Sequence, residues 1–347
     1  MHIRLYCLYS FLLLTGCQSS GNLISPPSSG EEIRYSAIYL IHADANYLYH
    51  DEDGNAHRAD EKVLAEAQQI GEKAEYGEVF IFHQKPERKI LWLFPRKDRR
   101  MLHYRNGKLV NDARYSPNFD NGLLSAEADI FKQNQSDVVE NSSKILLYFG
   151  HEIPVKGGTN YHYSQRSVPV NSHTFSEGAK KFLKGSKKIF DLAVLSTCNN
   201  GNPQMAQVLQ PVTKTLLASP QNLHLSHIDT DALLLMEEER KTSGEKIAGA
   251  MAGQTFNRLS EILHTEITLF VYDMKIIESY LAEFNSLHQI HLEDIEPQLF
   301  EENVDCAELP LFNESDFTKG VQGWHKKPQF GRRSNSKTHS GWGCRKN

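Results

Sequence analysis

The sequence has little cysteine, little net charge and only a short apolar run at its N-terminus. The run Leu5 to Leu14 has ten residues. This is about half of what a membrane-spanning helix needs, so the run suits the core of a signal peptide. The formal net charge is −5, which argues against the basic footprint of a nucleic-acid-binding domain. Hydrophobic residues make up 39% of the 347 residues, enough to bury one large core and too many for a disordered chain.

The N-terminal residues have the layout of a bacterial lipoprotein signal. The apolar run is followed by Leu14-Thr15-Gly16-Cys17, which resembles a lipobox, the motif whose cysteine is lipidated and becomes the first residue. Gln18 stands where an aspartate would favour retention at the inner membrane. We therefore expect removal of residues 1 to 16. Cys17 would then anchor the chain at the outer membrane of a Gram-negative cell, on its periplasmic or surface face. The alternative is an ordinary secretory signal with a chance Gly-Cys pair.

Beyond a tether of residues 17 to 35, rich in serine, glycine and proline, apolar runs alternate with helical patterns. Six runs predict strands covered on both faces, as in a mostly parallel sheet. They lie at residues 37–46, 78–83, 144–152, 189–195, 215–219 and 266–274. Asn106-Gly107 predicts a tight turn between two antiparallel strands. The pattern indicates one α/β domain over residues 36 to 290.

Small polar residues and a proline mark the expected helix starts. Asp60 is predicted to cap a helix that continues through Ile70, and Pro203 fits the first turn of another. Ser243 is predicted to cap a helix over residues 245 to 263. It also begins a Ser-x-x-Lys pattern known from penicillin-binding proteins, but that pattern stands alone here.

A histidine and a cysteine follow two neighbouring apolar runs. Lys144 to Phe149 leads through Gly150 to His151, and Leu192 to Leu195 leads to Cys198, 47 residues after the histidine. Caspase-type peptidases place their histidine about 50 residues before their cysteine. A cysteine between a strand and a helix lies at the carboxyl edge of the sheet, where the helix N-terminus favours a thiolate. We interpret the two residues as a catalytic pair; the alternative is a buried, inert cysteine.

Several segments, in this order, resemble the clostripain-like cysteine peptidases, which are relatives of the caspases. The resemblance covers residues 35 to 287. It rests on Tyr39-Leu40-Ile41-His42-Ala43-Asp44, Gly107-Lys108-Leu109, the run before His151, Phe190-Asp191-Leu192 to Cys198, Leu217-Ala218-Ser219 and Glu266-Ile267-Thr268-Leu269. It implies a caspase-like three-layer αβα sandwich, with a mostly parallel six-stranded sheet and an antiparallel hairpin appended to it. It also implies cleavage of peptide bonds without a cofactor. Leu195 to Gly201 looks, in addition, like the cysteine strand of CHAT domains, another branch of the same clan.

The resemblance assigns roles around the pair. Cys198 attacks the carbonyl and forms an acyl-enzyme, while His151 protonates the departing amine. Backbone N–H groups of Glu152 and Cys198 are expected to bind the oxyanion. Two motifs depart from the family. Glu152-Ile153 stands in place of two glycines, and Ser196 replaces the aspartate that binds a basic side chain in the basic-specific members.

Four residues are expected to contact substrate: Ser196, Ser219, Asp44 and Asp229. One of the two aspartates would have to supply the charge that Ser196 lacks, because a lone hydroxyl does not offset the burial of a guanidinium. The loop 152–174 carries basic residues, at which relatives are cut for activation. We interpret it as a plain surface loop.

The remaining cysteines and histidines have simpler interpretations. Cys306 and Cys344 reach a disulfide-permissive compartment and are available to pair. The segments His224 to Asp229 and His288 to His291 lack a complete ligand set nearby, so we predict no metal site.

The C-terminal residues 291–347 are predicted to form a largely disordered basic tail, because no acidic residue follows Asp316. Such a tail is usually solvated, and the alternative is that it binds an anionic polymer or lipid headgroups. Together these features predict a monomeric, lipid-anchored cysteine endopeptidase that acts on peptide or protein substrates and has no nucleic-acid partner. The alternative is a catalytically inactive caspase-fold lipoprotein that serves as a binding module in the cell envelope.

Overall fold

The computed structural model places all described residues in one compact unit, residues 31–347. It describes residues 32–43, 48–50, 56–85, 89–90, 94–95, 99–116, 122–136, 142–155, 170–183, 189–223, 227–282, 284, 304–308, 319–331 and 338–344. The predicted signal peptide, the predicted lipid-attachment residue Cys17 and the predicted substrate contact Asp44 lie outside these residues. In this described part, none of the helices combines the length and the apolarity needed to span a membrane.

A nine-stranded sheet forms the centre of the unit, in the order β14-β12-β11-β10-β9-β1-β4-β7-β8. Its strands are β1 (Tyr35–His42), β4 (Gly77–Gln84), β7 (Arg99–Arg105), β8 (Lys108–Tyr115), β9 (Ser143–Phe149), β10 (Leu192–Ser196), β11 (Thr215–Ala218), β12 (Ile267–Asp273) and β14 (Val321–Lys326). The central strands β11, β10, β9, β1 and β4 run parallel. β12 pairs antiparallel with β11. All six strands predicted from apolar runs are confirmed.

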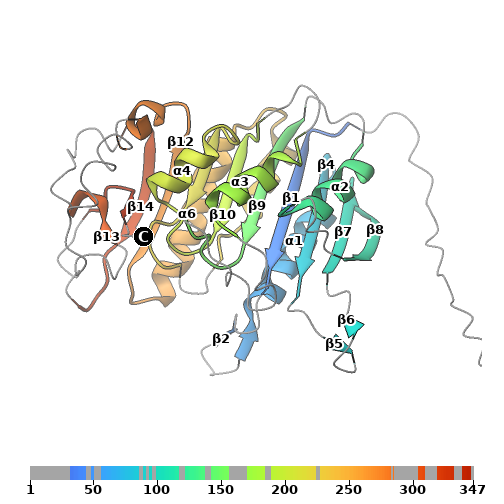
Figure 1. Ribbon diagram of the computed structural model, residues 1–347, viewed down its shortest axis with the longest axis horizontal. Coiled ribbons are helices and arrows are strands. Elements are labelled where there is room, and N and C mark those ends of the chain that lie inside the picture. The colour runs from blue at the N-terminus through green and yellow to red at the C-terminus, as the bar shows by residue number, and fades with distance from the viewer. Residues whose placement is uncertain are drawn as a thin grey trace, which may run out of the picture. The chain divides into compact units, whose positions relative to one another are not determined.

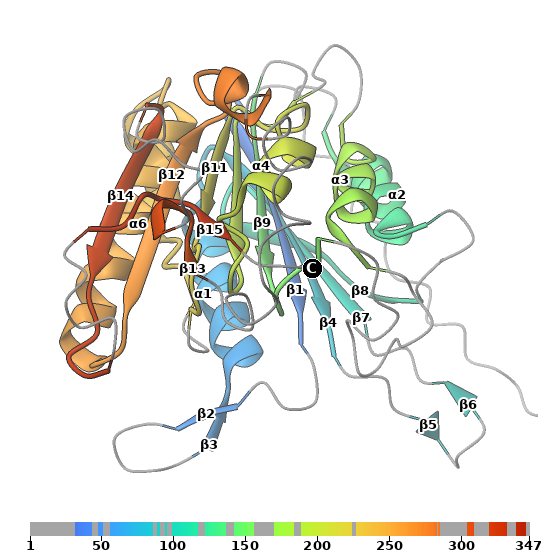
Figure 2. The same ribbon diagram turned by 60° about the vertical axis from the view of Figure 1, so that its left-hand side comes forward.

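Helices cover both faces of the sheet (Figures 1 and 2). They are α1 (Ala59–Lys73), α2 (Ser125–Asn134), α3 (Ser172–Lys180), α4 (Pro203–Leu209), α5 (Leu235–Glu238) and α6 (Gly244–Ile262), with the 3-10 turns η2 (Asp231–Leu234) and η4 (Cys306–Glu308). Alternate side chains of the central strands enter one of two buried hydrophobic clusters. One cluster contains residues of α2, α3 and α4, and the other contains residues of α1 and α6. The result is the predicted three-layer αβα sandwich.

The hairpin β7–β8 extends the main sheet beyond β4. Its turn residues have positive φ, 49° at Asn106 and 73° at Gly107, as the expected Asn-Gly turn requires. Three short pairs lie outside the main sheet. They are β2 (Leu48–His50) with β3 (Ala56–Arg58), β5 (Lys89–Ile90) with β6 (Phe94–Pro95), and β13 (Val304–Asp305) with β15 (Gly343–Cys344).

The prediction of a largely disordered C-terminal tail is wrong for the described part of that segment. β14 adds an edge strand to the sheet by pairing antiparallel with β12. Further along, a disulfide joins Cys306 to Cys344, and Trp342 is fully buried. Trp342 packs against Tyr272 of β12, with ring centroids 4.7 Å apart. This aromatic contact and the cross-link tie residues 304–308 and 338–344 to the domain.

Helix starts agree with the sequence at two of three places. Ser243 accepts a hydrogen bond from the N–H of Lys246 at 3.2 Å, and Asn202 caps the helix that Pro203 begins. Asp60, however, is not the cap of α1, which follows Arg58. Its carboxylate is fully buried and contacts His83 at 2.8 Å. Asp60 therefore lies inside the helix, where its side chain contacts His83 and does not cap the helix start.

Candidate active site

The pairing of β9 with β10 brings the histidine and cysteine segments to one level. Phe149, the last paired residue of β9, lies opposite Ser196, the last residue of β10. His151 and Cys198 each follow two residues later, and neighbouring strands of a sheet are about 4.8 Å apart. Both side chains are partly exposed, so both are accessible at the carboxyl edge of the parallel strands.

A buried asparagine fixes the two segments to each other beyond the last strand pair. The side-chain oxygen of Asn200 accepts a hydrogen bond from the Ile153 N–H at 2.9 Å, and its amide nitrogen donates to the Ile153 carbonyl at 2.9 Å. The hydroxyl of Thr197 donates to the same oxygen at 2.6 Å. Because Asn200 and Ile153 are fully buried, these bonds are shielded from competition with water. They hold the histidine segment in register with the cysteine turn.

The residue after the cysteine contacts the residue after the histidine. Asn199 has a left-handed backbone, with φ of 55°, a conformation that asparagine tolerates better than most residues. Its side-chain amide donates to the Glu152 carboxylate at 2.7 Å. The carboxylate of Glu152 is thus bound beside the cysteine turn.

A third segment, the turn after β11, completes the surroundings of the cysteine. The Leu223 N–H donates to Cys198 Sγ at 3.4 Å. The same turn accepts the Asn199 N–H on the Gln221 carbonyl at 3.0 Å and the Gly201 N–H on the Ser219 carbonyl at 2.8 Å. A Cβ at Gly201 would lie 2.6 Å from the backbone nitrogen of Pro220, so only glycine allows this approach. A hydrogen-bond donor directed at sulfur favours the thiolate over the thiol.

The predicted pocket residues have structural partners. The Ser196 hydroxyl is buried and accepts the Ile228 N–H at 2.9 Å. Ser219 uses its hydroxyl within its own turn, donating to the Gln221 carbonyl at 2.8 Å. Asp229 binds Arg258, whose Nε lies 3.0 and 2.9 Å from the two carboxylate oxygens. Its charge is therefore balanced by an arginine of the protein itself.

Three residues that could hold a metal ion gather beside Ser196, namely Glu66, His227 and Asp229, with ligand atoms within 4.8 Å of one another. His227 Nε2 contacts the Glu66 carboxylate at 2.7 Å. Burial disfavours the charged carboxylate, but the hydrogen bond and charge of His227 outweigh it, so the pKa of Glu66 is lowered. Since the Arg258 guanidinium already occupies Asp229, the geometry is that of a hydrogen-bonded ion-pair network. The other predicted histidine candidates, His224, His288 and His291, lie outside the described residues.

Comparison with known proteins gives a match in structure alone. No protein-family model matches the sequence, and no curated protein is similar to it in sequence. A secreted C11 cysteine protease of Bacteroides thetaiotaomicron, "iotapain", is 12% identical, with a TM-score of 0.58 over 90% of this chain and 93% of that one. This chain has the C11, clostripain-like cysteine protease fold.

Two further C11 structures support the assignment of the clostripain-like fold. A secreted Bacteroides thetaiotaomicron C11 protease in complex with an irreversible peptide inhibitor has a TM-score of 0.53 at 10% identity. The match covers 76% of this chain and 71% of that one. An inactive zymogen C11 protease of Parabacteroides distasonis has a TM-score of 0.55 at 12% identity, over 91% and 92% of the two chains.

Sequence reasoning missed the residues that hold the two segments of the candidate site together. Asn200 is one of several polar residues after the cysteine, and nothing local marks it as the partner of Ile153. Its distance from Ile153 is 47 residues, the same as between the catalytic candidates. That repeated offset was the available signal, because parallel strands keep a constant register.

Proposed function

We propose that this protein is a cysteine endopeptidase, with Cys198 as nucleophile and His151 as its acid–base partner. The observation that carries the proposal is the β9–β10 register. It ends in the Phe149–Ser196 pair and continues into the Asn200–Ile153 bonds. A histidine and a partly exposed cysteine at one level of this edge are the arrangement that thiol peptidases need.

The chemistry follows from the two side chains and their backbone surroundings. The Cys198 thiolate, stabilised by the Leu223 N–H, attacks the carbonyl carbon, and a carbon–sulfur bond forms. The oxyanion accepts hydrogen bonds from the backbone N–H groups of Glu152 and Cys198. Protonated His151 then gives its proton to the leaving amine, and the peptide bond breaks. Water hydrolyses the resulting thioester and returns the thiol.

The pocket favours a substrate whose side chain before the cleaved bond is not basic. Ser196 carries no charge, and Asp229 is neutralised by Arg258. An arginine or lysine entering here would lose its hydration without gaining an unpaired carboxylate among the described residues. That one similar protein binds an irreversible peptide inhibitor supports a peptide substrate for this chain as well.

The test is labelling by a panel of peptidyl acyloxymethyl ketones with differing first side chains, applied to a chain that lacks residues 1–17. Rapid labelling that both Cys198→Ala and His151→Ala abolish is the expected result. If folded protein resists the whole panel, the peptidase proposal fails, and the fold serves instead as a binding module in the envelope.

We also propose that the mature chain is held at a membrane through Cys17. The support is the lipobox-like Leu14-Thr15-Gly16-Cys17. Mass spectrometry of the N-terminal peptide from bacterial membranes is expected to find a diacylglyceryl group on that cysteine. Recovery of the chain as a soluble, unmodified form after export would overturn the anchor.

A further inference from the structure

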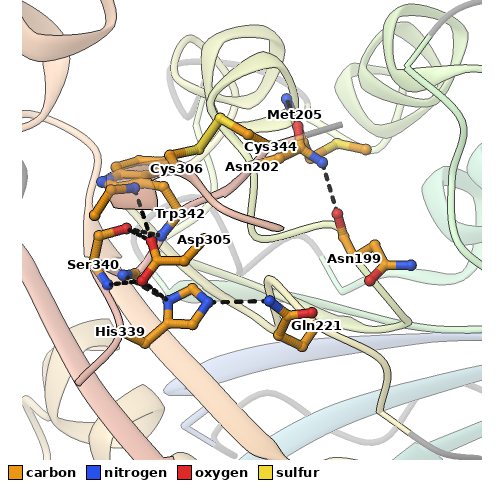
Figure 3. The surroundings of a disulfide bond; sticks show 12 residues. Asn199, Asn202, Met205, Gln221, Asp305, Cys306, His339, Ser340, Trp342 and Cys344 are labelled. Carbon is orange, nitrogen blue, oxygen red and sulfur yellow. Dashed lines mark hydrogen bonds and ion pairs between the residues drawn. A yellow bond between two sulfur atoms is a disulfide. The ribbon is translucent and has the colours of Figure 1, made fainter. Parts of the chain in front are cut away.

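A cross-linked C-terminal segment lies against the two turns that surround the cysteine. The Gly343 N–H donates to the Gly201 carbonyl at 2.9 Å. His339 Nε2 lies 3.2 Å from the side-chain nitrogen of Gln221. Figure 3 shows the side chains of His339 and Gln221 directed at each other, in the surroundings of the Cys306–Cys344 disulfide. Residues more than 100 positions downstream of the histidine and the cysteine thus contact the turns of the candidate site.

His339 is held rigidly in this position. Its side chain is 2% exposed, and its Nδ1 lies 3.7 Å from Asp305. The Gly341 N–H donates a hydrogen bond to Nδ1 at 3.0 Å. Asp305 accepts the Ser340 N–H at 2.9 Å and precedes Cys306 of the disulfide. With one nitrogen fixed by its own segment, the ring presents the other nitrogen to Gln221.

The backbone of Gln221 connects His339 to the segment that carries Cys198. Its carbonyl accepts the N–H of Asn199, the residue after the cysteine, at 3.0 Å. Two residues further on, Leu223 donates its N–H to Cys198 Sγ. A shift of Gln221 would move both the cysteine turn and the donor that faces the sulfur.

We propose that His339 is a positioning residue for the Cys198 thiolate, acting through Gln221 on the turn that carries the Leu223 N–H. The inference rests on the proposed function, in which Cys198 is the nucleophile. The disulfide contributes to this positioning, because it joins residues 304–308 to residues 338–344, the two short segments that hold His339. The active site of this protein therefore includes its C-terminal segment.

The test compares two substitutions that retain different nitrogens of the ring. A glutamine reaches about as far as Nε2 and keeps the contact with Gln221, whereas an asparagine reaches about as far as Nδ1 and keeps only the contacts within its own segment. The readout is the rate of Cys198 alkylation by iodoacetamide in the full mature chain, followed by mass spectrometry of the Cys198 peptide. We expect His339→Asn to slow alkylation about three- to tenfold, the effect of one lost buried hydrogen bond, and His339→Gln to restore most of the rate.

A double-substitution cycle identifies the route of the effect. Gln221→Met removes the side-chain amide at nearly equal length and is expected to slow alkylation as much as His339→Asn. The two together should cost no more than either alone, because both break one contact. Additive losses, or wild-type rates in both variants, would overturn the proposal. So would a melting temperature lowered equally in the asparagine and glutamine variants with equal loss of rate, since that pattern indicates general destabilisation.

The alkylation assay is independent of peptide cleavage. If the peptidyl probes fail to label the wild type while iodoacetamide still distinguishes His339→Asn from His339→Gln, the peptidase proposal fails and the positioning role of His339 stands. If peptidyl labelling is rapid and indifferent to His339, the peptidase proposal stands and the positioning role fails.

Discussion

The side chain of Asn200 binds both backbone groups of Ile153, the N–H and the carbonyl, each at 2.9 Å. This pair joins the cysteine turn to the histidine segment where strand pairing has ended. The first prediction follows from it. Asn200→Asp keeps the oxygen that accepts the Ile153 N–H but turns an acceptor toward the Ile153 carbonyl. We expect the free energy of unfolding to fall by about 1–3 kcal/mol and labelling of Cys198 by a peptidyl probe to fall at least tenfold.

Ser243→Ala is the matched control for Asn200→Asp. It removes a helix cap at α6, far along the chain from the cysteine turn, and is expected to cost about 1 kcal/mol of stability. Its peptidyl labelling rate should equal that of the wild type. An Asn200→Asp variant that loses stability yet keeps the wild-type labelling rate would show that the hydrogen bonds between Asn200 and Ile153 are not needed for the reactivity of Cys198.

A second prediction concerns Glu152, whose carboxylate accepts the Asn199 amide at 2.7 Å. A negative charge this near the nucleophile opposes formation of a second anion. Glu152→Gln removes the charge and keeps an oxygen acceptor. We expect alkylation of Cys198 by iodoacetamide near pH 6.5 to become about two- to fivefold faster, with a smaller difference at 0.5 M salt. A slower reaction would instead assign Glu152 a supporting role.

A third prediction addresses substrate preference through Arg258. Its guanidinium binds both oxygens of Asp229, and Arg258→Met removes that partner with little change in length. We expect the labelling rate with a lysyl probe, relative to a leucyl probe, to rise several-fold. Arg100→Met is the control, because it breaks a similar pair with Asp112 on the exposed hairpin and should leave the ratio unchanged. No rise in the Arg258 variant would exclude Asp229 from the pocket.

A fourth prediction is a pH dependence of stability that arises at His103. Burial lowers the pKa of this histidine, and the nearby Glu78 carboxylate opposes the shift only in part. The unfolded chain therefore takes up a proton near pH 6.5 that the folded state resists. His103 thus contributes its full stability above about pH 6.5 and loses it as the pH falls toward the lowered folded-state value. The urea concentration at the denaturation midpoint should decrease as the pH is lowered from 7.5 to 5.5. His103→Gln should make this decrease smaller.

The control for the pH experiment is His264→Gln, which replaces an exposed histidine. It should leave the decrease as in the wild type. Equal decreases in all three proteins would show that other groups set the acid sensitivity.

The six central strands could be predicted because each is buried on both faces, and burial imposes an unbroken apolar run. β14 could not, since its sequence Val321-Gln322-Gly323-Trp324-His325-Lys326 has no unbroken apolar run. It is an edge strand, and its Gly323 lies so close to Phe270 of β12 that a side chain would not fit. A Cβ on Gly323 would lie 1.9 Å from the Phe270 ring. Basic composition indicated a solvated tail, whereas pairing with β12 and the disulfide decided otherwise.

The catalytic candidates could be predicted from the sequence, but the residues that hold them in place could not. His151 and Cys198 stand at strand ends, where sequence position and spatial position coincide. Asn200, Gln221 and His339 act through partners from 47 to 118 residues away, and the residue types alone name no partner. Ser196 stays a predicted substrate contact from its place two residues before the cysteine, and its hydroxyl also accepts the Ile228 N–H, a partner that the sequence does not indicate.

The candidate site depends on the register between β9 and β10. It does not depend on the length of the chain that connects the two strands. The count of 47 residues includes the whole connection between the strands, yet His151 and Cys198 each lie two residues beyond the Phe149–Ser196 pair. We therefore expect the two segments to keep their alignment when the length of the connection is changed, because the alignment depends on the pairing of the strands.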